Sequence, residues 1–192
     1  MRISEVPTDT EESAQKVANG KTIALIGLMG AGKSSVGRRL ADTLDLPFYD
    51  SDEQIELAAG LSVTDIFSVH GETEFRRGEQ RVIERLLEGP QHILATGGGA
   101  FMNPDIRASL KQHAVTIWLR ADLETLWKRV SRKDGRPLLK TENPKQRLAD
   151  LLETRNPVYA EADIVVDSRE GPHSTAVNAI LKALEDYTKA DV

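Results

Sequence analysis

The sequence predicts an α/β fold, a three-layer α/β/α sandwich around a five-stranded parallel sheet. Two observations lead to this prediction. Short apolar runs alternate with amphipathic stretches of about ten or more residues, a pattern typical of βαβ units. The apolar runs are nearly continuous, as in strands that helices cover on both faces. A chain of 192 residues is long enough to bury a sizeable core in one such domain.

Each expected element follows from its own stretch of sequence. Strands are expected at 21–27, 46–50, 92–96, 114–119 and 162–167. Helical periodicity predicts helices over 34–45, 52–59, 62–69, 72–87 and 173–187, and further helices after Asn103, after Asp122 and before Pro157. Gly60 is expected to end the second of these helices, and Gly71 to break the segment between 62 and 87.

Composition narrows the class of protein. A net charge of -5 and a pI near 5.5 argue against broad binding of nucleic acid or of anionic membranes. No apolar run approaches the length of a membrane span, and the acidic N-terminus lacks the apolar segment of a secretory signal. The chain has no cysteine, which excludes disulfides and thiolate metal sites. Together these features predict a cytoplasmic protein.

The chain divides into an extension and one domain. Residues 1–20 are polar and poorly periodic, so we expect an extension with at most a short helix near 11–17. Residues 21–190 form the single predicted domain and contain no internal repeat. Within it, 131–145 is charged and interrupted by glycine and proline. We expect this segment to be a surface lid.

The motif GLMGAGKS at 27–34 lies between an apolar strand and a helix, the context that a phosphate-binding loop requires. Backbone N–H groups in such a loop bind phosphate at a helix N-terminus. Gly30 and Gly32 allow the loop to close around phosphate oxygens. Lys33 is expected to reach the β- and γ-phosphates, and Ser34 to ligate Mg²⁺. The loop predicts binding of a nucleoside triphosphate, but not the reaction that follows.

Three classes of function share such a loop. A GTPase needs a guanine-reading N-K-x-D motif, which the sequence lacks. A mechanical ATPase needs an apolar strand that ends in acidic residues. The stretch 163–167 matches superficially, but it comes late in the chain and is better explained as the last core strand. A small-molecule kinase needs an acceptor site at the same sheet edge and a lid that excludes water, and the sequence offers candidates for both.

Two aspartates follow the second expected strand. Asp50 and Asp52 fall at the carboxyl edge of the sheet, where doubly wound folds bind their ligands. One carboxylate could support Mg²⁺ through its water shell. The other could accept a hydrogen bond from an alcohol and orient or deprotonate it. A helix cap is an equally reasonable role for one of them, and both roles can hold at once.

Three arginines could bind anions near this edge. Arg76 lies one helical turn before Glu79, which could hold its guanidinium toward an anion, although a surface ion pair is the simpler interpretation. Arg155 lies just before Pro157, at an expected helix end where cations are favoured. Arg136, in the expected lid, could stabilise transition-state charge over the phosphates, although most loop arginines are simply solvated.

The glycine triplet in TGGGA, at 96–100, follows the third expected strand. No G-K-[ST] follows it, which argues against a second phosphate loop. Residues without side chains would let an acceptor lie against bare backbone, with the N–H of Gly98 or Gly99 available to it. A simple turn is the alternative interpretation.

Together these motifs resemble the shikimate kinase family. The resemblance runs from Lys21 to Leu184 and includes, in order, GLMGAGKSSVGRRLA, FYDSD, DIFSVHGETEFRRGE, TGGGA, GRPLL and RNPVYAEAD. It implies a P-loop fold of the nucleoside monophosphate kinase type. It also implies transfer of the γ-phosphoryl group of ATP to the 3-hydroxyl of shikimate, giving shikimate 3-phosphate and ADP, a step toward chorismate and the aromatic amino acids.

The resemblance also implies roles for individual residues. Ser34 and Asp50 would hold Mg²⁺, and Asp52 would act as the base. The implied catalytic residues are Lys33, Asp52 and Arg136. Contacts to ATP are implied for Gly30, Ala31, Gly32, Lys33, Ser34, Ser35, Arg129, Arg136 and Arg169. Contacts to shikimate are implied for Asp52, Arg76, Gly98 and Arg155, with Glu79 supporting Arg76.

The expected partners are therefore the two small molecules, ATP and shikimate, with Mg²⁺ and without nucleic acid or membrane. The resemblance implies a monomer. The residues alone leave two alternatives open. Gluconate, a nucleoside monophosphate or another hydroxy acid could replace shikimate, since two arginine forks and an aspartate suit any small anionic polyol. The chain could also be a nucleotide-binding regulatory module, although Lys33, Asp52 and Arg136 argue against that.

Overall fold

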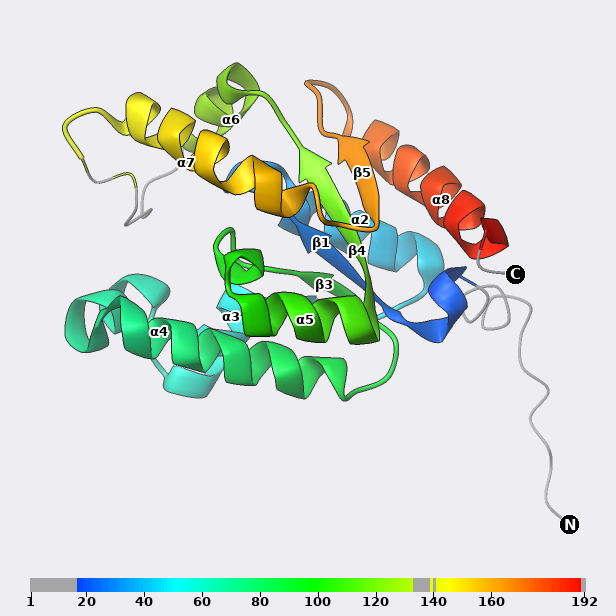
Figure 1. The fold of residues 1–192 in the computed structure, drawn as a ribbon, viewed down its shortest axis with the longest axis horizontal. Helices are drawn as coiled ribbons and strands as arrows, with labels where there is room; N and C mark the ends of the chain where they lie inside the picture. The colour runs from blue at the N-terminus through cyan, green and yellow to red at the C-terminus, as the bar shows by residue number, and fades with distance from the viewer. Residues whose placement is uncertain (1–16, 133–138, 140, 191–192) are drawn as a thin grey trace, which may run out of the picture.

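A computed structural model describes residues 17–132, 139 and 141–190. Its sheet has five parallel strands in the order β2-β3-β1-β4-β5. The strands are β1 (Thr22–Ile26), β2 (Phe48–Asp50), β3 (Ile93–Ala95), β4 (Ala114–Arg120) and β5 (Ile164–Asp167). Ile23 of β1 pairs with Ile93 on one side and Val115 on the other. Figure 1 shows helices on both sides of this sheet, which confirms the predicted α/β architecture.

The described helices agree with the sequence pattern at most of their ends. They are η1 (Val17–Gly20), α2 (Lys33–Leu44), α3 (Ser51–Ala59), α4 (Val63–Leu87), η2 (Ala100–Met102), α5 (Pro104–His113), α6 (Leu123–Val130), α7 (Pro144–Tyr159) and α8 (His173–Ala190). Asn103 caps α5 ahead of Pro104. Asp122 caps α6, where its carboxylate accepts a hydrogen bond of 2.8 Å from the N–H of Thr125.

The predicted end of α7 is wrong. Helix α7 does not end at Pro157 but continues to Tyr159. The proline lies near the end of the helix, where its missing N–H costs one backbone hydrogen bond. Arg155 and Tyr159, on either side of it, are both hydrogen-bonded to the carbonyl of Gly98, and these bonds hold the last turn in place.

Gly71 breaks α4 as predicted: its φ of 79° and ψ of 170° are not helical, and they form a kink between two helices. Gly60 ends α3 in a left-handed conformation, also as predicted. Most of the short helix expected near 11–17 lies outside the described residues. The last helix is three residues longer than the predicted 173–187, and ends at Ala190.

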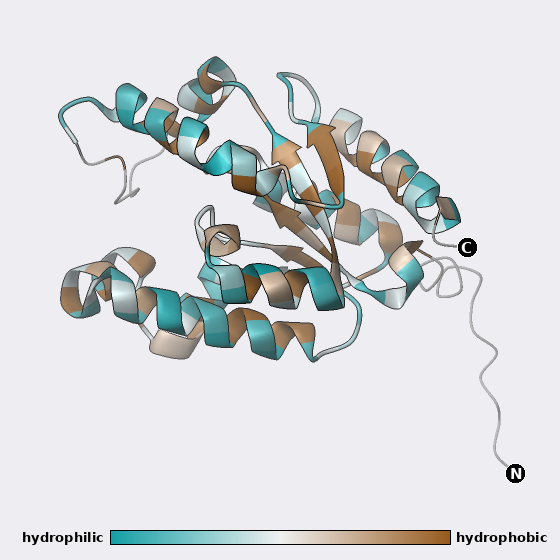
Figure 2. Ribbon diagram, viewed as in Figure 1, coloured by the Kyte–Doolittle hydropathy of each residue, from teal (hydrophilic) through white to brown (hydrophobic). Residues whose placement is uncertain are grey.

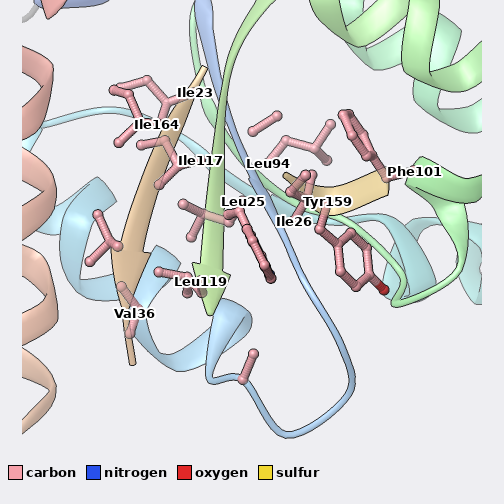
Figure 3. Close-up of a cluster of buried hydrophobic side chains, with 14 of the residues drawn as sticks. Ile23, Leu25, Ile26, Val36, Leu94, Phe101, Ile117, Leu119, Tyr159 and Ile164 are labelled. Atoms are coloured by element: carbon pink, nitrogen blue, oxygen red, sulfur yellow. The ribbon is translucent and has the colours of Figure 1, made fainter. Parts of the chain in front are cut away.

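The core lies between the sheet and its helices, and every residue of β1 is buried. Figure 2 shows hydrophobic colours on the strands and hydrophilic colours on much of the helix surface. Figure 3 shows side chains from several elements in this core, including Leu25, Leu94, Ile117 and Tyr159. Helix α2 packs on α8, and α4 packs on α5. Because β2, β3 and β1 are parallel neighbours in the sheet, their carboxyl ends lie side by side. No helix in the described part of the chain is long and apolar enough to cross a membrane.

Candidate active site

The segments that follow β1, β2 and β3 meet at the carboxyl edge of the sheet, around a cavity of about 710 Å³. The residues that line this cavity include Lys33 from the segment after β1, Asp52 from the segment after β2 and Gly98 from the segment after β3. They are separated in sequence, and the strand order alone makes them neighbours. The structure therefore brings the predicted phosphate loop, aspartate and glycine triplet to one site.

The phosphate loop has the conformation that its glycines predict. Gly30 and Gly32 have φ of 83° and 96°, a region that other residues rarely adopt. A Cβ on Gly30 would lie 2.8 Å from the Val130 side chain. Among the described residues, no side chain caps the start of α2, so the first N–H groups of the helix can bind an anion in the cavity. Lys33 is buried and donates hydrogen bonds to the carbonyls of Gly27 and Leu28, at 2.8 and 3.1 Å.

Ser34 and Asp50 lie in contact, as a shared cation site requires. The Ser34 hydroxyl donates a hydrogen bond of 2.6 Å to one carboxylate oxygen of Asp50. The other oxygen accepts a hydrogen bond of 3.0 Å from the N–H of Asp52 and caps α3. Asp50 is therefore a helix cap that also faces the phosphate loop.

These two side chains fit Mg²⁺ only together with other ligands. No cluster of three or more His, Cys, Asp or Glu side chains that could hold a metal ion occurs among the described residues. Magnesium sites of kinases normally combine one or two protein oxygens with phosphate oxygens and water. A hydroxyl and a carboxylate next to a phosphate loop match this type of site.

Asp52 lies in the first turn of α3 and lines the cavity. Its pKa is raised from 3.8 to about 6, mainly by burial and then by repulsion from Asp50 and Glu79, whereas Lys33 and Arg76 oppose the rise. A carboxylate with this pKa is mostly ionised at neutral pH and can accept a proton from an alcohol. The electrostatic contact with Lys33 connects Asp52 to the phosphate loop.

Arg76 and Glu79 form more than a surface ion pair. The Arg76 guanidinium donates a hydrogen bond of 2.7 Å to Glu79 Oε2, and the Glu79 side chain is fully buried. A second, exposed carboxylate, that of Glu72, accepts from the same guanidinium at 3.2 Å. Burial raises the pKa of Glu79, and Arg76 opposes that rise. The pair fixes the direction of the guanidinium from within the protein, as the sequence suggested.

Glycines at 97 and 99 make room for these charged groups. A Cβ on Gly97 would lie 2.6 Å from Glu79 Oε1 and 2.8 Å from Asp52 Oδ1, so the two carboxylates converge over this residue. A Cβ on Gly99 would lie 2.6 Å from Arg76 Nη2. The triplet therefore makes room for the charged side chains of the site itself, a role that its sequence does not indicate.

Gly98 is held in place through its carbonyl and lies against the phosphate loop. Its carbonyl accepts hydrogen bonds from Arg155 Nη1, at 2.8 Å, and from the Tyr159 hydroxyl. A Cβ on Gly98 would lie 3.2 Å from the backbone nitrogen of Met29, in the phosphate loop. Gly98 therefore packs on the phosphate loop as well, and its predicted backbone contact with the acceptor stays a prediction.

The three other arginines that were predicted to contact ATP differ in where they lie. Arg129 lines the cavity and donates to the carbonyls of Gly30, at 3.1 Å, and of Arg169, at 2.8 Å, which ties the phosphate loop to the segment after β5. The Arg169 side chain is 84% exposed and pairs instead with Asp167. Arg136 lies outside the described residues.

Several functional candidates carry no sequence signal of their own. Lys128 and Arg132 line the same cavity and add positive charge near the phosphate loop. Tyr159 reaches Gly98 from the helix that also carries Arg155. A lysine or arginine at the end of a helix and a buried tyrosine are common in any domain, so only their position in space distinguishes them.

The fold and the site define a P-loop kinase that acts on a small molecule. Residues 29–185 match the model of the shikimate kinase family. A shikimate kinase of Caulobacter vibrioides is 57% identical over 85% of this chain and 82% of its own length. One of Rhizobium meliloti is 47% identical over 93% of each.

Comparison with solved structures also shows similarity to shikimate kinases. The structure of a shikimate kinase from Acinetobacter baumannii in complex with shikimate superposes with a TM-score of 0.86 and 37% identity, over 90% of this chain and 97% of that one. A gluconokinase from Sinorhizobium meliloti shares the fold, at a TM-score of 0.61 and 22% identity, over 89% of this chain and 95% of its own. The chain belongs to the shikimate kinase family, whose activity is the ATP-dependent phosphorylation of shikimate in aromatic amino-acid biosynthesis.

Proposed function

We propose that this chain transfers the γ-phosphoryl group of ATP to the 3-hydroxyl of shikimate and releases ADP and shikimate 3-phosphate. The observation that carries the proposal is the position of Asp52. Its carboxylate lines the same cavity as Lys33 and interacts electrostatically with both Lys33 and Arg76. A hydroxyl held by this carboxylate would lie between a triphosphate on the loop and an anion-binding arginine.

The nucleotide half of the site uses the loop and its neighbours. Backbone groups of Gly30, Ala31, Gly32, Ser34 and Ser35 bind the phosphates, and Lys33 neutralises the β- and γ-phosphates. Ser34 and Asp50 hold Mg²⁺, which supplies neutralisation of phosphate charge when bound. Arg129 and Arg136 add positive charge to the nucleotide side of the site. The backbone carbonyl of Arg169, which accepts a hydrogen bond from Arg129, lies at the border of this side.

The acceptor half binds shikimate by its two ends. Arg76 and Arg155 bind the carboxylate, which suits the planar fork of a guanidinium. Asp52 accepts the hydrogen bond of the 3-hydroxyl and takes its proton as the oxygen attacks phosphorus. The new O–P bond forms while the bond from the γ-phosphorus to the bridging oxygen breaks, and ADP leaves with that electron pair. Gly98 and Gly99 provide the floor beneath the substrate.

We also propose that residues 21–190 act as one domain, with a lid at 131–145, and that the protein works as a cytoplasmic monomer. Its acidic net charge of -5 is consistent with binding neither nucleic acid nor anionic membranes. The described residues of the proposed site all come from one chain, which is consistent with a monomer. Size-exclusion chromatography with light scattering measures the oligomeric state directly, and a dimer would contradict this part of the proposal.

A coupled assay of ADP release tests the proposed function. Shikimate, gluconate and a nucleoside monophosphate are compared as acceptors, with ATP and Mg²⁺ in excess. We expect turnover that depends on shikimate and is at least about a hundredfold slower with the other two, since each of them lacks part of the required pattern of charges and hydroxyls. Turnover with gluconate alone, or with no acceptor, would contradict the proposal.

A further inference from the structure

The Tyr159 hydroxyl has a position that core packing does not explain. The ring lies in the core, 5.9 Å from the Trp118 ring between centroids, and its side chain is almost completely buried. Figure 3 shows the ring among the labelled core side chains, with its oxygen at the edge of that group. That oxygen donates to the carbonyl of Gly98, in the glycine triplet of the acceptor site.

The same carbonyl also accepts from Arg155. Arg155 Nη1 donates to it at 2.8 Å, so both lone pairs of the Gly98 oxygen are used. Arg155 and Tyr159 are four residues apart on α7 and therefore lie on one face of the helix. A guanidinium has five N–H donors, and one of those of Arg155 is directed at the Gly98 carbonyl.

The orientation of this peptide determines what the acceptor meets. In a trans peptide, the carbonyl of Gly98 and the N–H of Gly99 point in opposite directions. The carbonyl points to α7, so the N–H of Gly99 points away from it, and no described residue accepts a hydrogen bond from that N–H. Gly99 is also the residue whose Cβ would meet the Arg76 guanidinium, at 2.6 Å. An anion bound by Arg76 would therefore lie close to Gly99.

We propose that Tyr159 is a positioning residue for the acceptor. Its hydroxyl holds the Gly98–Gly99 peptide in one orientation. Because Arg155 donates to the same carbonyl, the hydroxyl also holds the Arg155 guanidinium in the orientation that binds the substrate carboxylate. Burial raises the pKa of the Tyr159 hydroxyl, so that it remains a hydrogen-bond donor at working pH. This inference rests on the proposed function, because it assigns Tyr159 to the shikimate end of the site.

Tyr159→Phe tests the inference, because it removes the hydroxyl and keeps the ring. We expect the KM for shikimate to rise about threefold to tenfold, the loss that one buried hydrogen bond produces, with an unchanged KM for ATP. The melting temperature should stay close to that of the wild type. Tyr49→Phe is the matched control, since Tyr49 lies on β2 with its ring against His92, and it should change neither constant.

Trp118→Phe separates the hydroxyl from the packing of the ring. It alters the ring contact of Tyr159 and leaves the hydroxyl in place, so we expect it to lower the melting temperature without a specific change in the KM for shikimate. Tyr159→Phe is also combined with Arg155→Lys. Because both residues act on one carbonyl, their effects on the KM for shikimate should not add.

The outcomes distinguish this inference from the proposed function. A wild-type enzyme that does not phosphorylate shikimate would overturn both. An active wild type together with an unchanged KM for shikimate in Tyr159→Phe would overturn the positioning role alone. Equal rises in both KM values, or simple additivity with Arg155→Lys, would assign Tyr159 to the general stability of the fold and overturn the inference as well.

Discussion

Arg76 donates a hydrogen bond of 2.7 Å to Glu79, and the glutamate side chain of this pair is completely buried whereas the arginine remains about a quarter exposed. The buried carboxylate therefore holds the guanidinium from behind and leaves its outer edge for a ligand. The second Glu79 oxygen has no hydrogen-bond partner among the described residues and converges with Asp52 over Gly97. One glutamate thus connects the acceptor arginine to the proposed base.

Glu79→Gln should change two properties of the enzyme. The KM for shikimate should rise about tenfold, because the amide holds the Arg76 guanidinium less strongly than a carboxylate. The acid limb of the pH profile should move to lower pH, because repulsion from Glu79 raises the pKa of Asp52 and the substitution removes it. Steady-state kinetics between pH 5 and 9 measure both. Glu72→Gln, which alters the exposed partner of Arg76, is the control and should leave the acid limb in place.

Gly99→Ala should damage the acceptor half of the site. The new methyl group would lie 2.6 Å from Arg76 Nη2 and displace the guanidinium, so we expect the KM for shikimate to rise about tenfold or more, with little change for ATP. Gly98→Ala, which instead presses on the backbone of Met29, should raise both KM values. Gly78→Ala is the control, since no other part of the described structure beyond its own helix backbone lies within 4 Å of its Cβ position. Equal effects of the first two variants would contradict this division of the triplet.

Arg155→Lys tests the arginine clamp. Lysine keeps the charge but cannot donate to a carboxylate and to the Gly98 carbonyl in one fixed geometry, so the KM for shikimate should rise about tenfold while the KM for ATP stays constant. Arg147→Lys, on an exposed position of the same helix, is the matched control. An unchanged KM for shikimate in Arg155→Lys would remove Arg155 from the acceptor site.

Asp52→Asn should stabilise the protein at the same time as it removes the proposed base. The folded pKa of Asp52, about 6, lies above its unfolded value of 3.8, so the native state loses stability as the pH rises from about 3.8 through about 6. We expect a gain in the free energy of unfolding on the order of 2 kcal/mol at pH 8 and a smaller gain at pH 5. Urea unfolding measures it, with Asp186→Asn on α8 as the control. A loss of stability at pH 8 would mean that the Asp52 carboxylate is stabilised in the folded protein.

Features encoded in neighbouring residues were predictable from the sequence. The alternation of apolar runs and amphipathic stretches gave the sheet and its helices, and the spacing within 27–34 gave the phosphate loop. Asp50 and Asp52 were placed correctly at the sheet edge because the carboxyl end of a parallel strand is defined by its own direction. The cap on α3 follows from the same local rule.

Features that depend on packing were not predictable. The end of α7 was misjudged because hydrogen bonds from Arg155 and Tyr159 to Gly98, 57 and 61 residues away, hold the helix beyond Pro157. The link from Arg129 to Gly30 spans 99 residues. The burial of Glu79 and the direction of the Gly98 carbonyl likewise appear only when distant segments meet. Sequence patterns identify the residues of this site, but tertiary structure determines which contacts each of these residues makes.

The most direct test of the central claim is the pH dependence of kcat/KM for shikimate, in the wild type and in Asp52→Asn, with ATP saturating. If Asp52 is the base, wild-type kcat/KM should rise as pH increases through about 6 and then level off, because the carboxylate must be ionised. Asp52→Asn should lose that limb and at least about a hundredfold in kcat, with an unchanged KM for ATP. Wild-type-like turnover in Asp52→Asn, with the same acid limb, would contradict the claim.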